Sequence, residues 1–205
     1  MSSALNNVFG NNILGLALNV ASTFFPPAAL LGSLSNMLVD AVGGAIKQAV
    51  DMLMQQSCMP KFIRDCVSDL VDQILPGQKQ PSSPEVDDYT EGKYGDFMKQ
   101  FSNDLATDLV EKTKESREEL EAAGAGTAGG KSGSKSWLLA LAQAFGKMAD
   151  AKAKELTEMG KNINNENPSE MIEYQALTKE FDIMMQTFTN AIKTIGDANA
   201  AAVRK

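Results

Sequence analysis

The sequence predicts an all-α protein, a helical bundle of about six helices that ends in an antiparallel coiled-coil hairpin. The long segments are rich in Ala, Leu, Met, Glu and Lys, and the chain contains no Asn-Gly or Asp-Gly hairpin signal. Apolar residues recur at spacings of three and four along most of these segments. At 205 residues and 43% hydrophobic, the chain can bury a sizeable core without metals or many disulfides.

The N-terminal region is uncharged as far as Asp40. Its start, "MSSALNNVFGNN", lacks the Lys or Arg of a secretory signal peptide, so we do not expect classical export. The apolar stretch 13–25 ends at Pro26-Pro27 and is shorter than the roughly 20 residues of a membrane span. It is expected to form a buried or interfacial helix, although 13–54 could insert as a hairpin in a membrane-active state.

Two amphipathic helices are predicted next, each with an apolar residue at every fourth position. The stripe of the first contains Leu34, Leu38, Val42, Ile46 and Val50, followed by Leu53. The stripe of the second contains Phe62, Cys66, Leu70 and Ile74, and that helix ends at Pro76-Gly77. Gly43-Gly44 in the first stripe marks either a local weakness or a close approach of another segment.

Two cysteines, Cys58 and Cys66, flank the corner between these helices. A disulfide between them would close a short loop, stabilise the fold by about 2 to 3 kcal/mol and suit an oxidising compartment. Two buried thiols on neighbouring helices are the alternative. A pair of this spacing without other Cys or His is a poor zinc site.

A polar linker is predicted at 78–88, "QKQPSSPEVDD", and a fourth helix after it. The apolar face of that helix contains Tyr94, Phe97, Phe101, Leu105 and Leu109. Its continuation at 111–123, "EKTKESREELEAA", loses the apolar face, so we expect a charged, solvated extension.

The segment "AGTAGGKS" at 125–132 satisfies a loose nucleotide-binding P-loop pattern. A P-loop follows a buried strand and opens a helix, whereas this segment follows an acidic helix end in a Gly-rich tract. Lys131 and Ser132 are therefore interpreted as linker residues, and no cofactor is expected.

A fifth helix is predicted after a cap at Ser134 or Ser136, and a sixth after Asn167-Pro168. The sixth alternates spacings of three and four from Tyr174 to Ala202, as in a heptad seam. The predicted interaction residues of this seam are Leu177, Phe181, Met184, Phe188 and Ile195. The seam can pack internally against the fifth helix or be shared with another subunit.

We therefore divide the chain into three parts. Residues 1–122 form an N-terminal apolar bundle with an acidic extension, 123–136 a Gly/Ser-rich linker, and 137–205 the hairpin. The linker permits the two helical parts to dock or to move apart.

Composition argues against several function classes. The net charge of −7 opposes a nucleic-acid surface, and the absence of histidine removes His bases and His metal ligands. Asp65, Asp69 and Asp72 share part of one helical face, but they are better explained as the solvated border of an apolar stripe than as a catalytic cluster. An enzyme is not expected, and no catalytic, cofactor-binding or metal-binding residue is assigned.

The uncharged Ser/Asn-containing start, the apolar helices and the C-terminal hairpin resemble secreted filament, needle-tip and translocator proteins of bacterial type III secretion systems. This resemblance implies export without a cleaved signal, a dedicated chaperone, and assembly through the hairpin. Cysteines and a long Gly-rich break before Trp137 depart from that pattern.

The function hypothesis that follows is a non-enzymatic secreted protein that acts through helix association, with a protein partner or other copies of itself. The alternative is a membrane-active, pore-forming or translocator protein whose uncharged N-terminal helices insert.

Overall fold

The computed structural model describes residues 27–123, 131–162 and eight helical positions farther along the chain. These positions are Tyr174, Thr178, Phe181, Asp182, Met185, Gln186, Thr189 and Asn190. The described elements are α3 (Pro27–Ser57), α4 (Lys61–Ile74), the 3-10 turn η1 (Leu75–Gln78), α5 (Pro84–Ala122) and α6 (Lys131–Asn162). The all-α class is confirmed for this part of the chain, which contains no strand. The count of about six helices and the coiled-coil hairpin stay predictions.

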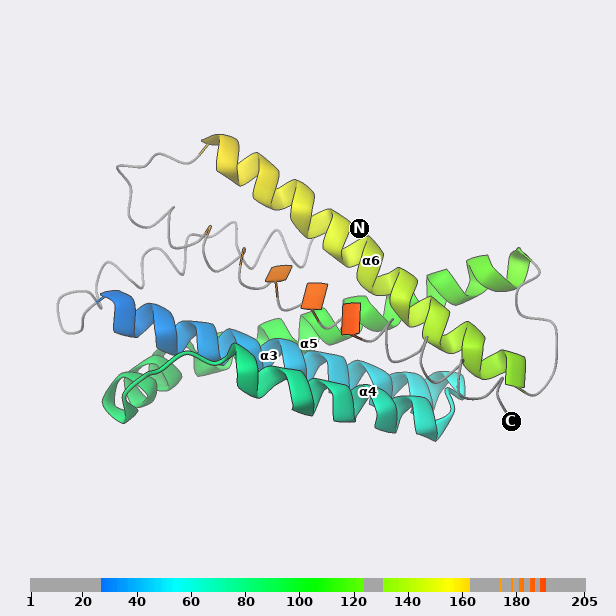
Figure 1. Cartoon of the computed structure of the whole chain (residues 1–205), viewed down its shortest axis with the longest axis horizontal. Coiled ribbons are helices and arrows are strands. Elements are labelled where there is room, and N and C mark those ends of the chain that lie inside the picture. The colour runs from blue at the N-terminus through cyan, green and yellow to red at the C-terminus, as the bar shows by residue number, and fades with distance from the viewer. Residues whose placement is uncertain are drawn as a thin grey trace.

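Helices α3 and α5 run side by side in the same direction, because α4 returns the chain between them (Figure 1). Hydrogen bonds join them along their length, from Ser33 with Asp87 near their starts to Arg117 with the Ser57 carbonyl near their ends. Helix α6 then crosses α5 and extends beyond the bundle (Figure 1).

One core lies between these helices and includes α6. Every member of the predicted α3 stripe, from Leu34 to Leu53, is at most 6% exposed. Of the predicted α5 face, Phe97 is half-buried and the other four residues are buried. Trp137, Leu141, Phe145 and Met148 of α6 belong to the same core.

The predicted stripe of α4 is wrong by one residue. The buried stripe is Ile63, Val67 and Val71, whereas Phe62 is 56% exposed. Both stripes repeat every fourth residue and lie next to each other on the helix, and packing against α3 selects the β-branched one.

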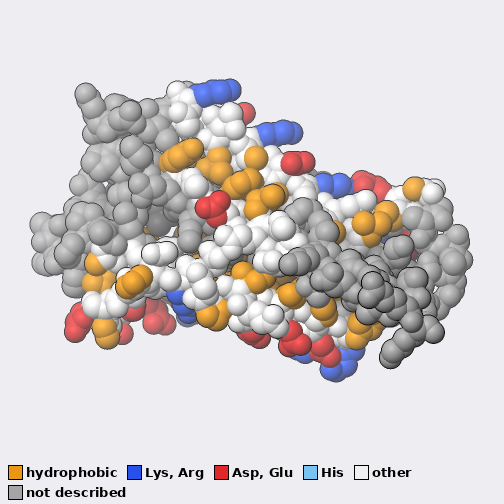
Figure 2. Space-filling view, viewed as in Figure 1, with side chains coloured by type: hydrophobic (Ala, Val, Ile, Leu, Met, Phe, Trp, Pro, Cys, Tyr) orange, Lys and Arg blue, Asp and Glu red, His pale blue; other side chains and the backbone are white. Residues whose placement is uncertain are grey.

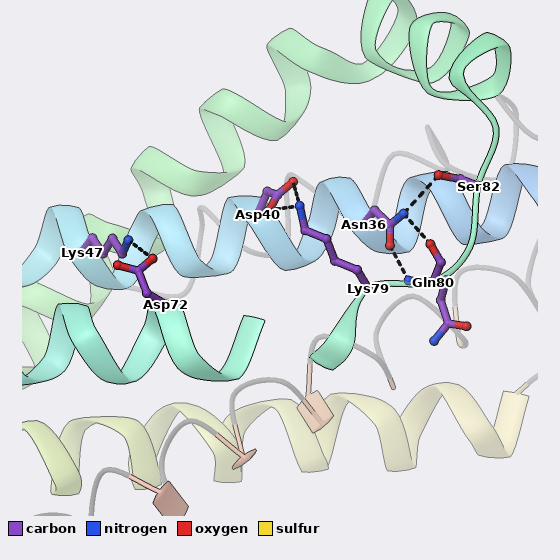
Figure 3. Close-up of polar contacts among 7 residues, drawn as sticks. All are labelled: Asn36, Asp40, Lys47, Asp72, Lys79, Gln80 and Ser82. Carbon is purple, nitrogen blue, oxygen red and sulfur yellow. Dashed lines mark hydrogen bonds and ion pairs between the residues drawn. The ribbon is translucent and has the colours of Figure 1, made fainter. Parts of the chain in front are cut away.

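The connection from η1 to α5 is fixed to α3 by polar contacts (Figure 3). The Asn36 amide donates to the Gln80 carbonyl (2.9 Å) and accepts from the Gln80 backbone amide (2.7 Å). Lys79 pairs with Asp40 at 2.8 Å. Helix α5 begins at Pro84, so the second half of the predicted linker is helical.

Other segments approach α3 closely at Gly32 and Gly43. A Cβ atom on Gly32 would lie 3.1 Å from the Pro81 carbonyl oxygen. A Cβ on Gly43 would overlap the Leu75 side chain of η1. The close approach suggested for Gly43-Gly44 is therefore present, and it is made by η1 at Gly43.

The predicted α6 boundary also needs correction. The helix begins at Lys131, before the expected cap, so Ser136 lies inside the helix and is buried. Within the described helices, no segment is long and apolar enough to cross a membrane.

Candidate assembly surface

The first half of α6 is buried on almost all sides. Between Ser136 and Ala149 only Leu139 is exposed, at 43%. Such all-round burial is typical of a helix inside a core rather than of a helix on its surface. The buried side chains are Ser136, Trp137, Ala140, Leu141, Ala142, Ala144, Phe145, Met148 and Ala149.

Trp137 anchors this half of α6 to α5. Its ring is 3% exposed, and the Arg117 guanidinium lies over it at 4.1 Å from the ring centroid. Arg117 also donates to the Ser57 carbonyl at the end of α3 (3.4 Å) and pairs with Glu121 (2.9 Å). One cation therefore connects three helices at the crossing.

The α5 extension is not solvated as the sequence predicts. Thr113, Ser116 and Leu120 are buried, and Glu119 pairs with Lys147 of α6 at 2.8 Å. The three buried residues follow one another at spacings of three and four, so they form a single face of α5. Because two of the three residues are polar, apolar periodicity in the sequence does not predict this buried face.

Charged groups continue along the crossing. Lys152 of α6 is 2% exposed and pairs with Glu155 at 3.2 Å. Burial raises the pKa of Asp108 on α5, and the charges of Glu111 and Asp104 raise it further, whereas Lys112 and Lys152 act in the opposite direction. The carboxylate of Asp108 is therefore less favourable here than in water.

Four buried side-chain oxygen atoms of α5 and α6 make no hydrogen bond within the described structure. They are the hydroxyl oxygen of Tyr94, Oγ of Ser116, Oγ of Ser136 and Oε1 of Gln143. A buried polar atom without a partner costs about 1 to 3 kcal/mol. Such atoms are not confined to these two helices, because Oγ of Ser35 in α3 is also buried without a hydrogen-bond partner.

The second half of α6 is amphipathic. Its outer edge bears charged side chains, and its hydrophobic side chains lie toward the bundle (Figure 2). Leu156 and Met159 are half-buried against the core, while Lys154, Glu158 and Lys161 are exposed.

Two contacts join the C-terminal part of the chain to the described helices. A Cβ on Gly160 would lie 3.5 Å from the Tyr174 ring, so the ring packs on the end of α6. The Gln78 side-chain amide donates to Gln186. Tyr174 thus lies at the end of α6, and Gln186 lies at η1.

Of the five predicted seam residues, the structure describes Phe181, which is helical and half-buried. Leu177, Met184, Phe188 and Ile195 lie outside the described residues. The seam therefore stays a prediction.

The remaining predicted sites have these positions. Cys58 and Cys66 are free thiols; Cys58 is exposed with φ 56°, and Cys66 is half-buried in α4, where burial and Asp69 raise its pKa. Of the two alternatives left open by the sequence, this structure has the free thiols, and the disulfide stays a hypothesis. Lys131 and Ser132 begin α6, while the glycines before them lie outside the described residues.

The α4 aspartates act as partners of basic side chains. Asp65 binds Lys61 and Arg64, and Asp72 binds Lys47 of α3 at 2.5 Å (Figure 3). Asp69 is exposed. No group of three potential metal ligands occurs among the described residues.

A surface groove of about 610 Å³ lies between α3 and α5. Its polar lining is largely paired within the groove: Asp40 with Lys79, and Asp87 with Ser33 at 2.5 Å. It presents both signs of charge and no unsatisfied cluster that would define a ligand.

Comparison with known proteins finds a similarity for the C-terminal part. Residues 140–205, about a third of the chain, match the family model described as type III secretion needle (MxiH, YscF, SsaG, EprI, PscF, EscF). No curated protein and no solved structure matches the chain. The resemblance to type III secretion proteins is confirmed, and the matched region begins inside the buried half of α6.

Proposed function

We propose that this chain is a non-enzymatic structural component of a bacterial type III secretion apparatus, and that it acts by helix association with other copies of itself. The match of residues 140–205 to the needle family carries this proposal. Subunits of that family are structural and assemble into a polymer.

Association would use the C-terminal helix. The spacing of its apolar residues predicts one continuous seam, and the eight described positions from Tyr174 to Asn190 are all helical, which supports a continuous helix there. Phe181 on this seam is half-buried rather than fully enclosed. A half-buried aromatic side chain retains apolar area that a second copy can cover.

Other parts of the proposal follow from the same resemblance. Export would proceed through the secretion system without a cleaved signal peptide, and a secretion chaperone would cover the apolar helices before export. Neither step requires a cofactor, and catalysis is not part of the proposed role.

The test is a pair of charge substitutions in the seam, Phe181→Asp with Phe188→Asp. The control is Thr189→Asp, which adds a negative charge at an exposed position of the same helix. Sedimentation velocity measures association, and circular dichroism measures helix content. We expect the seam variant to stay folded and lose association, and the control to associate like the unaltered chain.

Two results would contradict this assignment. If the seam variant loses its helical signal and its cooperative melting transition, the seam is internal to one chain. If it associates as strongly as the control, the contact between copies lies elsewhere.

A further inference from the structure

The groove of about 610 Å³ between α3 and α5 has an apolar floor. Met37 and Ala41 of α3 contribute to this floor together with Gly95 and Met98 of α5. Ala41 and Met98 are at most 8% exposed and belong to the core, so the floor is held in place by packing. A Cβ atom on Gly95 would meet the Glu91 Cγ at 3.7 Å, an ordinary van der Waals distance. The groove therefore has room above Gly95 for an apolar side chain from outside.

The edge of this groove on α5 is acidic. Asp87 and Glu91 line it one turn apart. The Asp87 carboxylate accepts hydrogen bonds from two serine side chains, and Glu91 is exposed. The two lysines of the lining, Lys79 and Lys99, each have a carboxylate of the same chain within 3.5 Å. The carboxylates of Asp87 and Glu91 therefore remain to attract a basic group of a partner.

Phe62, the second residue of α4, is a large apolar side chain that projects from the surface. It is 56% exposed, more than any other large hydrophobic residue in the described part of the chain. The apolar row that begins with Phe62 continues along α4 through Cys66, Leu70 and Ile74, which are half-buried. Single exposed apolar residues are common on soluble proteins, whereas a continuous apolar row is more typical of a contact surface.

The surroundings of Phe62 are basic at the start of α4. The Lys61 side chain next to it is 75% exposed. Helix α4 has no side-chain cap and no acidic residue in its first turn, so the free N–H groups of this turn add partial positive charge. Lys61 pairs with Asp65 at 2.6 Å, but exposed pairs of this kind contribute little and exchange partners easily. This end of α4 thus has the opposite sign to the groove edge.

Phe62 and the groove lie at different ends of the bundle. Helix α4 returns along α3 in the opposite direction (Figure 1). Arg64 of α4 pairs with Asp51 of α3 at 2.6 Å, and Asp51 is ten residues, or about 15 Å of helix, beyond Ala41 in the groove lining. Phe62 lies farther from the groove than Arg64, because it precedes Arg64 on α4. Phe62 therefore cannot occupy the groove of its own chain.

We propose that Phe62 of one copy of this chain docks in the α3–α5 groove of the next copy, where Lys61 faces Asp87 and Glu91. This inference rests on the proposed function, because it adds a second contact between copies to the contact through the C-terminal helix. The two surfaces of this contact are different, so the contact is heterologous and repeats from copy to copy in a ring or a filament. A stable interface buries about 800 Å² per partner, so this small contact strengthens the C-terminal one rather than replacing it.

Two variants remove the contact from its two sides. Phe62→Ala removes the projecting ring, and Gly95→Leu fills the groove. Pelleting of polymer by ultracentrifugation gives the critical concentration for assembly, and circular dichroism verifies that each variant is folded. We expect each variant to raise the critical concentration at least about tenfold, because a large apolar anchor at the centre of a contact carries much of its binding energy.

Each variant has a matched control. Leu139→Ala truncates the other exposed large hydrophobic residue, at 43% exposure, and Gly92→Leu adds the same side chain to α5 at a position with no atom within 4 Å. Both controls should change the critical concentration by less than about twofold. Losses in the controls as large as in the variants would overturn the inference, because the effect would then not depend on this contact.

The double variant tests whether Phe62 and Gly95 belong to one contact. Once either side is removed, the other has nothing left to lose, so Phe62→Ala with Gly95→Leu should assemble no worse than the weaker single variant. Losses that add in the double variant would overturn the inference, because the two positions would then act independently.

The outcomes separate this inference from the proposed function. If the unaltered chain forms a polymer and both single variants assemble like it, the groove contact is wrong while the proposed function stands. If the unaltered chain forms no polymer at any concentration, the proposed function fails, and the groove contact fails with it.

Discussion

Removal of the Trp137 ring should loosen the crossing of α5 and α6. The ring is 3% exposed, and replacing a buried Trp with Ala typically costs 3 to 5 kcal/mol. The lost cation–π contact with Arg117, whose side chain is 34% exposed, adds at most about 1 kcal/mol. We therefore expect Trp137→Ala to lower the free energy of unfolding by about 4 kcal/mol.

Thermal unfolding followed by circular dichroism measures this change, since Trp137 is the single tryptophan and its loss removes the fluorescence signal. For a chain of this size, about 4 kcal/mol corresponds to a fall in Tm of about 8 to 16 °C. A double-mutant cycle with Arg117→Ala isolates the stacking contribution, expected at about 0.5 to 1 kcal/mol. A loss below about 1 kcal/mol for Trp137→Ala would refute the burial of this ring.

The remaining predictions concern a glycine contact and two carboxylates. In urea unfolding, Gly32→Ala should be about 1 to 2 kcal/mol less stable than Gly92→Ala, because a Cβ at position 32 meets the Pro81 carbonyl oxygen at 3.1 Å while position 92 is open. Equal stabilities of the two variants would contradict that contact. Hydrogen bonds from Ser33 and Ser82 lower the pKa of Asp87, so the Asp87 carboxylate stabilises the fold at neutral pH, and this stabilisation is lost as the pH falls through the lowered pKa. Asp87→Asn should therefore reduce the free energy of unfolding at pH 7 and make it depend less on pH in acid. The pKa of Asp108 is raised instead, so the free energy of unfolding falls as the pH rises through that pKa. Asp108→Asn should therefore stabilise the chain at pH 7 and lose this advantage in acid, whereas a variant that is destabilised at pH 7 would contradict the burial of Asp108.

Local periodicity predicted the elements that pack through one continuous apolar stripe. In α3 the residues from Leu34 to Leu53 repeat at nearly constant spacing, and all of the predicted ones are buried. In α4 two apolar stripes lie side by side, so spacing alone could not determine whether Phe62 or Ile63 faces the core. Contact with α3 resolved this, and it is a tertiary effect.

The crossing of α5 and α6 could not be predicted from local sequence. Arg117 and Trp137 lie 20 positions apart on either side of a Gly-rich tract, and no periodic pattern connects them. Thr113 and Ser116 look like surface residues in the sequence, but both are buried in the fold. The resemblance to secretion proteins was predicted from the organisation of the whole chain, namely its uncharged start, its apolar helices and the expected C-terminal hairpin, whereas the family match covers residues 140–205.

Size-exclusion chromatography with light scattering, combined with negative-stain microscopy, tests the central claim most directly. The unaltered chain is measured over a range of concentrations, with anionic liposomes containing a trapped dye as a parallel sample. We predict concentration-dependent assembly into a regular polymer without dye release. A chain that stays monomeric at every concentration would contradict the structural role, and a monomer that also releases dye would favour the membrane-active alternative.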